Sequence, residues 1–182
     1  MRVTNVDVTV VEVPQIAPIA PYRSHVRSSS TTMSAIVRLE TDEGLVGWGE
    51  HNVNFLPDIS GASMQADARA WMIGRDPLNL QAFHQNCRLD TRLKSGIELA
   101  MWDLKGKALN VSVYELLGGL TREKVVCYPH IGERDVIERL VANCRQRQSE
   151  GWRFARWGMS DPMGDGDVFE PRRAVRYAIQ QV

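Results

Sequence analysis

The residue best placed for chemistry is Arg156, near the end of a short apolar segment, Trp152–Trp157. A guanidinium stays protonated above pH ~12, so Arg156 can donate hydrogen bonds or hold an anion but cannot by itself take a proton from carbon. His130 follows an earlier apolar segment, Val125–Tyr128. If both segments are parallel strands, the two side chains lie at the same end of a sheet, where barrel enzymes carry their chemistry. Arg156 and His130 are therefore candidates for one functional site.

Both residues also have simpler interpretations, which the sequence leaves open. Arg156 can pair with a neighbouring carboxylate as a structural lining residue, and His130 can be solvated or can support other side chains. Few other reactive groups compete with them. Only four of the 22 basic residues are lysines, namely Lys94, Lys105, Lys107 and Lys124. The three cysteines show no CxxC spacing, which predicts reduced thiols rather than a zinc site or a disulfide framework.

The N-terminal part reads as a small antiparallel sheet. A β-branched run from Val6 to Val13 stops at Pro14, and two further β-rich runs, 35–41 and 45–50, are separated by Asp42-Glu43-Gly44. Such a connection predicts a hairpin in which the glycine supplies a positive φ. These runs together predict a three-stranded antiparallel meander.

Loops and helices surround these strands. Residues 14–32 are rich in Pro, Ser and Thr, and residues 51–61 carry His, Asn, Pro, Asp and Gly, so both segments are predicted to be loops. Apolar residues recur at helical spacing from Ala62 to Met72, a second helix is expected to start near Pro77, and a longer one spans Ile97 to Ala108.

After Glu123 the pattern changes to alternating strands and helices. A strand over 125–128, a helix over 135–150, a strand over 152–157 and a helix from Glu170 onward make units typical of parallel βα repeats. The sequence stops inside that last helix without a cap or stop signal. The carboxylates from Asp161 to Asp167 lack the bidentate Glu of a calcium loop and are expected to form a turn.

The composition of the chain limits the kinds of molecule that it is expected to bind. The 22 basic and 22 acidic side chains of this 182-residue chain cancel, which argues against nucleic acid or an anionic membrane as partner. No stretch approaches the roughly 20 apolar residues of a membrane span, and the N-terminus does not read as a signal peptide. We therefore expect a cytoplasmic protein whose partner is a small molecule or another subunit.

The segment Ile97–Ala108, continued by Val113–Leu117 and Gly118-Gly119, resembles the signature helix of the mandelate racemase and muconate lactonizing enzyme group of the enolase superfamily. Gly47-Trp48-Gly49-Glu50 also fits this group. The resemblance covers essentially the whole chain. It implies an α+β capping domain over residues 1–123, with a three-stranded antiparallel meander plus helices, followed over 124–182 by the first βα units of an incomplete (β/α)8 barrel.

The resemblance also implies a reaction. Enzymes of this kind remove a proton next to a carboxylate, and Mg2+ stabilises the ene-diolate. Its ligands lie on the third to fifth barrel strands, which are absent here, so we predict no metal ligand in this chain and no activity of the chain alone. The family implies a lyase, an acid-sugar dehydratase, although metal ligands and base are missing.

The residues of the second barrel strand indicate which branch of the family the chain resembles. The racemase branch carries a Lys-x-Lys pair there, whereas this chain has Phe154 and Arg156. Arginine at this place resembles the mannonate and galactonate dehydratase-like branch. The resemblance implies that Arg156 is catalytic and that His130 lines the same pocket. Some mannonate dehydratases pair it with a tyrosine shortly after the strand, but this chain has no tyrosine between Trp157 and Tyr177.

The resemblance implies that the two cap loops fold over the barrel mouth and determine substrate specificity. Their polar residues suit a polyhydroxy sugar acid, and we expect substrate contacts from Tyr22, Arg23, His25, His51 and Asn52. By contrast, Trp102, Asp103 and Lys105 are expected to hold helix, cap and barrel together. A racemase, epimerase or cycloisomerase of the same superfamily, or a non-catalytic module, are the alternatives. The full-length protein is expected to form a homo-oligomer.

Overall fold

The computed structural model describes residues 1–16, 22–23, 28–53, 60–131, 137–157, 175–176 and 179. The chain forms two compact units. The first joins Met1–Val13 to Thr32–Glu123, and the second joins Pro14–Thr31 to Lys124–Val182. The loop predicted over 14–32 therefore groups with the second unit.

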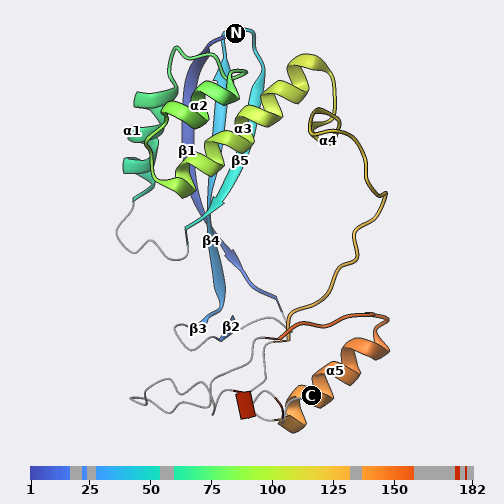
Figure 1. Ribbon diagram of the computed structural model, residues 1–182. Helices are drawn as coiled ribbons and strands as arrows, with labels where there is room; N and C mark the ends of the chain where they lie inside the picture. Colours follow the sequence, from blue (N-terminus) through green and yellow to red (C-terminus); the bar gives the residue numbers. More distant parts are fainter. Residues whose placement is uncertain are drawn as a thin grey trace. The chain divides into compact units, whose positions relative to one another are not determined.

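The first unit contains a three-stranded sheet (Figure 1). Strands β1 (Val3–Pro14), β4 (Thr31–Thr41) and β5 (Val46–Asn52) lie in the order β1-β4-β5. The sheet is antiparallel, and Gly44 has a φ of 79° in the turn between β4 and β5. The meander predicted from the sequence is confirmed.

Three helices cover this sheet, and a short fourth helix follows. They are α1 (Gly61–Met72), α2 (Leu80–Asn86), α3 (Thr91–Leu109) and α4 (Val113–Leu116). Helix α2 begins at Leu80 and not near Pro77, because Asn79 caps it: the Asn79 Oδ1 accepts a hydrogen bond of 3.2 Å from the Ala82 N–H. Pro77 precedes the helix as a buried residue.

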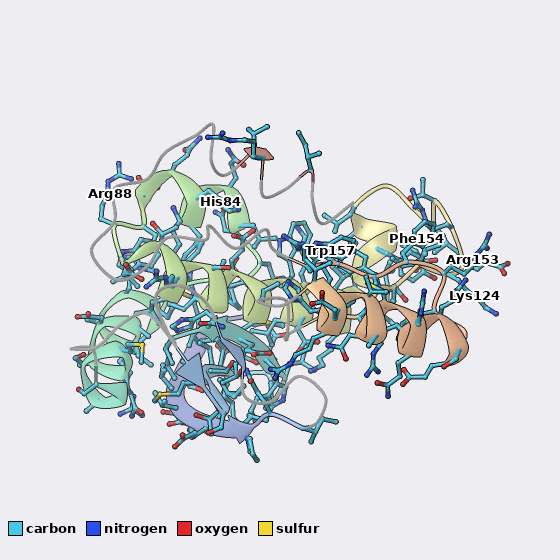
Figure 2. The ribbon with its side chains drawn as sticks, turned by 90° about the horizontal axis from the view of Figure 1, so that it is seen from below. His84, Arg88, Lys124, Arg153, Phe154 and Trp157 are labelled. Carbon is cyan, nitrogen blue, oxygen red and sulfur yellow. The ribbon has the colours of Figure 1, made fainter. Side chains whose placement is uncertain are left out.

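The hydrophobic core lies between the helices and one face of the sheet. Val37 and Leu39 of β4 are fully buried there with Ile97 and Leu104 of α3. The predicted apolar faces of the helices are confirmed in this core, although His84 of α2 projects from the helical surface (Figure 2), where its Nε2 lies 3.1 Å from the Glu98 Oε1. This contact between α2 and α3 is consistent with a structural role for His84.

Glycines bring α3 close to β5. A Cβ added at Gly49 would collide with the backbone oxygen of Gly96 and with the amide nitrogen of Ala100, and one at Gly47 would collide with the Ala100 oxygen. Contacts that close exclude any side chain. The Gly-Trp-Gly-Glu segment is therefore a packing motif that seats the signature helix on the sheet.

Polar groups of α3 also close the outer edge of β5. The Asp103 Oδ2 accepts a hydrogen bond of 2.9 Å from the Trp48 N–H, and the Lys107 Nζ donates to the Val46 carbonyl at 2.7 Å. Lys107 and Asp103 pair with each other at 2.6 Å. These contacts confirm that Asp103 holds the helix to the cap, and they block an edge that would otherwise be open to pairing.

The second unit contains a small hairpin and one long helix. Strands β2 (Tyr22–Arg23) and β3 (Ser28–Ser29) pair antiparallel, so the predicted loop contains a short ladder. Helix α5 (Ile137–Ser149) matches the helix predicted over 135–150. The turn predicted over 161–167 lies outside the described residues, as does nearly all of the helix predicted from Glu170.

The barrel strands predicted over 125–128 and 152–157 do not form as continuous strands. They are replaced by one parallel bridge between His130 and Arg156. Within the described residues no third strand pairs with either segment, and an isolated pair of strands is only marginally stable in water. Val125 accordingly remains 74% exposed.

No helix in the described part of the chain is long and apolar enough to cross a bilayer.

Candidate functional site

The parallel bridge fixes the backbone of Arg156. The Arg156 N–H donates to the Pro129 carbonyl at 3.0 Å, and the Ile131 N–H donates to the Arg156 carbonyl at 2.8 Å. In a parallel ladder, paired residues direct their side chains to the same face. The structure therefore brings the two predicted barrel residues, Arg156 and His130, together.

The guanidinium of Arg156 reaches a residue that was not among the predicted site residues. Its Nη1 donates to the hydroxyl oxygen of Tyr128 at 3.4 Å. Tyr128 stands two residues before His130, a spacing that places both on one face of an extended segment. That spacing was visible in the sequence, but which residue of the second segment faces it depends on the register.

The charge of Arg156 has no acidic partner among the described residues. Among the described residues no carboxylate lies within ion-pair distance of its guanidinium, whereas Arg147 pairs with Glu150 at 2.6 Å. Arg156 is also exposed. An exposed guanidinium with one neutral partner keeps donors available for an anion.

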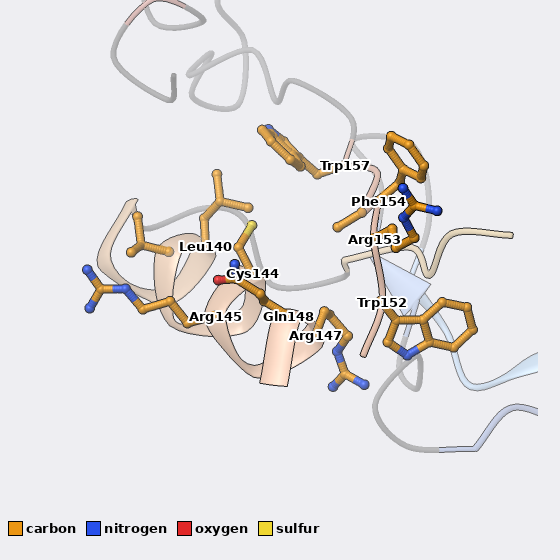
Figure 3. A pocket seen from close by; sticks show the side chains of 11 residues that line it. Leu140, Cys144, Arg145, Arg147, Gln148, Trp152, Arg153, Phe154 and Trp157 are labelled. Carbon is orange, nitrogen blue, oxygen red and sulfur yellow. The ribbon is translucent and has the colours of Figure 1, made fainter. Parts of the chain in front are cut away.

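A cavity of about 590 Å³ lies between α5 and the segment that carries Arg156. Figure 3 shows Trp157 across from Leu140 and Cys144 of α5. Arg156 is not among the lining residues, because its side chain is directed to Tyr128 instead. We therefore interpret the cavity as a packing space beside the helix and not as part of the Arg156 site.

The residues predicted on the first cap loop are only partly described. Tyr22 and Arg23 form β2, where they pair with Ser29 and Ser28. His25 lies outside the described residues. All three belong to the segment Pro14–Thr31, which shares its compact unit with Arg156 and His130.

The residues predicted on the second cap loop are in a strand instead. His51 and Asn52 are the last two residues of β5, paired with Ala35 and Ser34. The strand extends this far because the pairing continues: the Val53 N–H also donates to the Met33 carbonyl at 3.1 Å. The contact of His51 and Asn52 with a substrate stays a prediction.

The His51 imidazole is buried, with 6% of the residue exposed. Its ring lies against Gly96 of α3, and within the described part of the chain neither ring nitrogen has a hydrogen-bond partner. Burial lowers the pKa of His51 below its ordinary value, although the charge of Asp90 opposes this. His51 is thus a neutral core residue at the end of the sheet.

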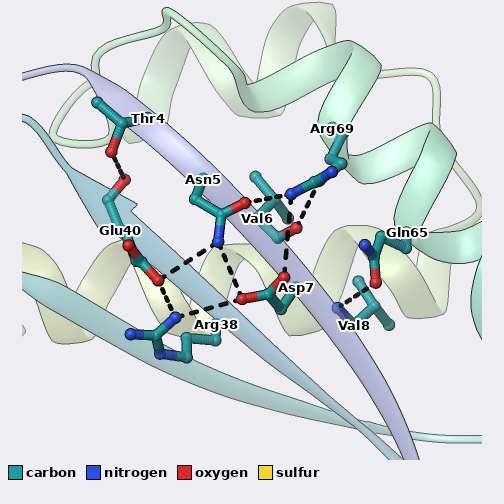
Figure 4. Close-up of polar contacts among 9 residues, drawn as sticks. All are labelled: Thr4, Asn5, Val6, Asp7, Val8, Arg38, Glu40, Gln65 and Arg69. Atoms are coloured by element: carbon teal, nitrogen blue, oxygen red, sulfur yellow. Dashed lines mark hydrogen bonds and ion pairs between the residues drawn. The ribbon is translucent and has the colours of Figure 1, made fainter.

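A second group of charged side chains lies on the face of the sheet opposite the core (Figure 4). Arg38 pairs with Glu40 and, at 3.2 Å, with Asp7. Hydrogen bonds from Asn5 and then from Arg38 lower the pKa of Glu40. These charges satisfy one another, which leaves no free charge for a ligand in the described network.

Helix α1 contributes to this network and closes the outer edge of β1. The Arg69 Nε donates to the Val6 carbonyl at 2.9 Å, and the Val8 N–H donates to the Gln65 Oε1 at 3.4 Å (Figure 4). Together with the α3 contacts on β5, side chains from two helices protect both edges of the sheet. We interpret this network as structural.

The described residues offer no site for a divalent metal. No group of three or more His, Cys, Asp or Glu side chains among them is arranged to hold an ion. Mg2+ needs several oxygen ligands in near-octahedral geometry, and the Tyr128, His130 and Arg156 group supplies no carboxylate. The residues of this site do not fit the metal that the family resemblance implies.

The chain matches the family model described as mandelate racemase / muconate lactonizing enzyme, N-terminal domain, over residues 5–118. A D-galactonate dehydratase of Pectobacterium atrosepticum is 37% identical over 160 residues, which cover 80% of this chain and 39% of that protein. One of Verminephrobacter eiseniae is 32% identical over 163 residues, with the same two shares. The chain thus spans about two fifths of the length of these curated relatives.

Solved structures show the same fold. The muconate lactonizing enzyme of Pseudomonas fluorescens complexed with muconolactone has a TM-score of 0.77 and is 23% identical, covering 99% of this chain and 49% of that one. The dipeptide epimerase of Enterococcus faecalis complexed with Mg and L-Leu-L-Tyr has a TM-score of 0.75 and is 22% identical, covering 100% and 49%. The chain therefore belongs to the mandelate racemase / muconate lactonizing enzyme family, and residues 5–118 form its N-terminal domain.

Proposed function

We propose that this chain supplies the capping domain, residues 1–123, and the first barrel segments, 124–182, of a Mg2+-dependent acid-sugar dehydratase of the enolase superfamily. The observation that carries the proposal is the exposed side chain of Arg156 on a backbone held by the parallel bridge to His130. Relatives named D-galactonate dehydratase, at 30–37% identity, support a sugar acid as substrate. The remaining barrel strands would come from the part of the relatives that this chain does not match.

The proposed reaction removes a proton next to a carboxylate and expels a hydroxyl group. When bound, Mg2+ supplies charge that stabilises the ene-diolate, and its ligands belong to the unmatched part of the relatives. Arg156 contributes fixed donors to a substrate carboxylate or to the departing hydroxyl, where negative charge develops. It does not act as the base, because a guanidinium stays protonated.

The remaining predicted residues have binding roles in this proposal. His130, the bridge partner of Arg156, would contact the substrate, and the grouping of Pro14–Thr31 with the barrel segments supports contacts from Tyr22, Arg23 and His25. His51 and Asn52 would contact the substrate from the end of β5. We further expect the complete enzyme to be a homo-oligomer.

A barrel-complete protein tests the proposal. In it, this chain is joined to the part of the Pectobacterium atrosepticum dehydratase that follows the matched segment. The protein should convert D-galactonate to a dehydrated keto acid with Mg2+ and lose that activity in EDTA. The product is measured by mass spectrometry and by a keto-acid assay.

Other substrates distinguish the alternatives. D-mannonate, muconolactone and L-Leu-L-Tyr are offered to the same protein, and the unaltered dehydratase serves as control for the donated part. A folded protein that epimerises the dipeptide or acts on the lactone would replace the dehydratase proposal by an epimerase or cycloisomerase. A folded protein that transforms none of them would support a non-catalytic role.

A further inference from the structure

We infer that Tyr128 and Arg156 form a two-donor pair that binds one oxyanion of the substrate, with Tyr128 both orienting the guanidinium and donating its own hydroxyl. The anion is identified as the carboxylate of a sugar acid, and this part of the inference rests on the proposed function. Its structural basis is the contact of 3.4 Å between the Arg156 Nη1 and the Tyr128 hydroxyl oxygen.

The backbone pairing of the two segments places Tyr128 next to Arg156. The Arg156 N–H donates to the Pro129 carbonyl and the Arg156 carbonyl accepts from the Ile131 N–H. These two bonds set Arg156 opposite His130. Tyr128 lies two residues earlier than His130, on the same face of the segment. The phenol therefore lies beside the guanidinium without depending on a flexible loop.

The direction of the hydrogen bond leaves a second donor free. A guanidinium has only N–H groups, so Arg156 must donate and the Tyr128 oxygen must accept. The phenolic hydrogen then points away from the guanidinium and remains available to an acceptor. Carboxylate oxygens accept from both kinds of donor, and bonds to a charged acceptor are the stronger ones.

Both side chains are accessible to such an anion. Tyr128 is 49% exposed and Arg156 is also exposed. Among the described residues no carboxylate pairs with the guanidinium of Arg156. The pair thus differs from the Arg38 network of the cap, where acids already neutralise the charge.

An NMR titration of the full 182-residue chain tests the pair without any catalysis. The Arg156 Nε–Hε signal, assigned by its loss in Arg156→Lys, should shift on addition of D-galactonate. The Tyr128→Phe variant should need about fivefold more D-galactonate for the same shift, because a fivefold change in Kd corresponds to the net free energy of one hydrogen bond. Tyr114→Phe is the matched control, since Tyr114 is 48% exposed on α4 and should change nothing.

Unchanged backbone shifts of Ile131 and Arg156 will show that Tyr128→Phe keeps the fold. The inference is overturned if the wild-type signal does not move, or if wild type and Tyr128→Phe titrate alike. In the barrel-complete protein, Tyr128→Phe should raise KM for the sugar acid about fivefold with a smaller effect on kcat. An inactive wild type there, with the NMR difference intact, removes the proposed dehydratase function and leaves the anion-binding pair standing.

Discussion

The guanidinium of Arg156 is the group on which the proposed chemistry depends most directly. In the barrel-complete protein, Arg156→Met removes the charge but keeps much of the side-chain length. Losing a charged contact made in the transition state should lower kcat/KM for D-galactonate about a hundredfold, on the order of 3 kcal/mol. Arg156→Lys should recover only part of this loss, because an ammonium lacks the planar fork.

Arg153→Met is the matched control for this prediction. Arg153 is an exposed arginine of the same segment, but it lines the cavity beside α5, whereas the hydrogen bond to Tyr128 comes from Arg156. Its replacement should leave kcat/KM within about twofold. If Arg156→Met kept the wild-type value, Arg156 would be a structural residue and the proposed role would be wrong.

His51 should make the stability of the cap depend on pH. Burial holds its folded pKa below the ordinary value of 6.5, so the unfolded chain binds more protons as the pH falls through that value. The free energy of unfolding should therefore fall between pH 7 and pH 5, and it should recover as the pH rises. Asp90 reduces this loss and the nearby Arg92 increases it.

The measurement is hydrogen exchange of core amides such as that of Val37, which reports the opening of the first unit by itself. His51→Leu should flatten the pH dependence, because it removes the titrating group while keeping an apolar contact with Gly96. An equal slope in wild type and His51→Leu would assign the pH dependence to other groups.

At the scale of elements, the contact between α3 and β5 depends on glycine. Gly49→Ala would place a methyl group against the backbone of Gly96 and Ala100, which cannot yield as a side chain can. The helix must then move away from the strand, also straining the bond from Trp48 to Asp103. We expect a loss of about 2–4 kcal/mol in the free energy of unfolding.

Thermal or urea unfolding measures this loss, with Gly61→Ala as the control. A Cβ at Gly61 would meet the Val10 Cγ2 at 3.3 Å and the Val8 backbone oxygen only at 3.8 Å, and alanine suits the first turn of α1. That variant should be neutral within about 0.5 kcal/mol. Equal stability of both variants would mean that the Gly-Trp-Gly-Glu segment does not act through close packing.

At the scale of the whole molecule, the described residues lack a metal site. A ligand stabilises a protein only if the folded state binds it, so millimolar Mg2+ should leave the melting temperature of the 182-residue chain unchanged. The barrel-complete protein, measured beside it, should melt at a higher temperature with Mg2+ than with EDTA. A magnesium-dependent rise in the chain itself would reveal ligands outside the described residues.

Sequence alone determined most of the first unit. The β-branched runs, the turn at Gly44 and the helical spacing of apolar residues each act over a few neighbours, and the resulting sheet and core agree with them. The signature helix likewise identified the family before any coordinates. Boundaries set by capping or by continued pairing were less predictable: Asn79 moved the start of α2, and β5 ran on through His51.

Only the tertiary structure decided the contacts that depend on register and close approach. That Asp103 and Lys107 close the β5 edge follows from the seating of α3 on Gly47 and Gly49. That Tyr128 meets Arg156 follows from one parallel bridge, because a shift by one residue would turn the side chain to the other face. Such pairings join residues far apart in the chain, and their spacing in the sequence carries no signal of which ones will meet.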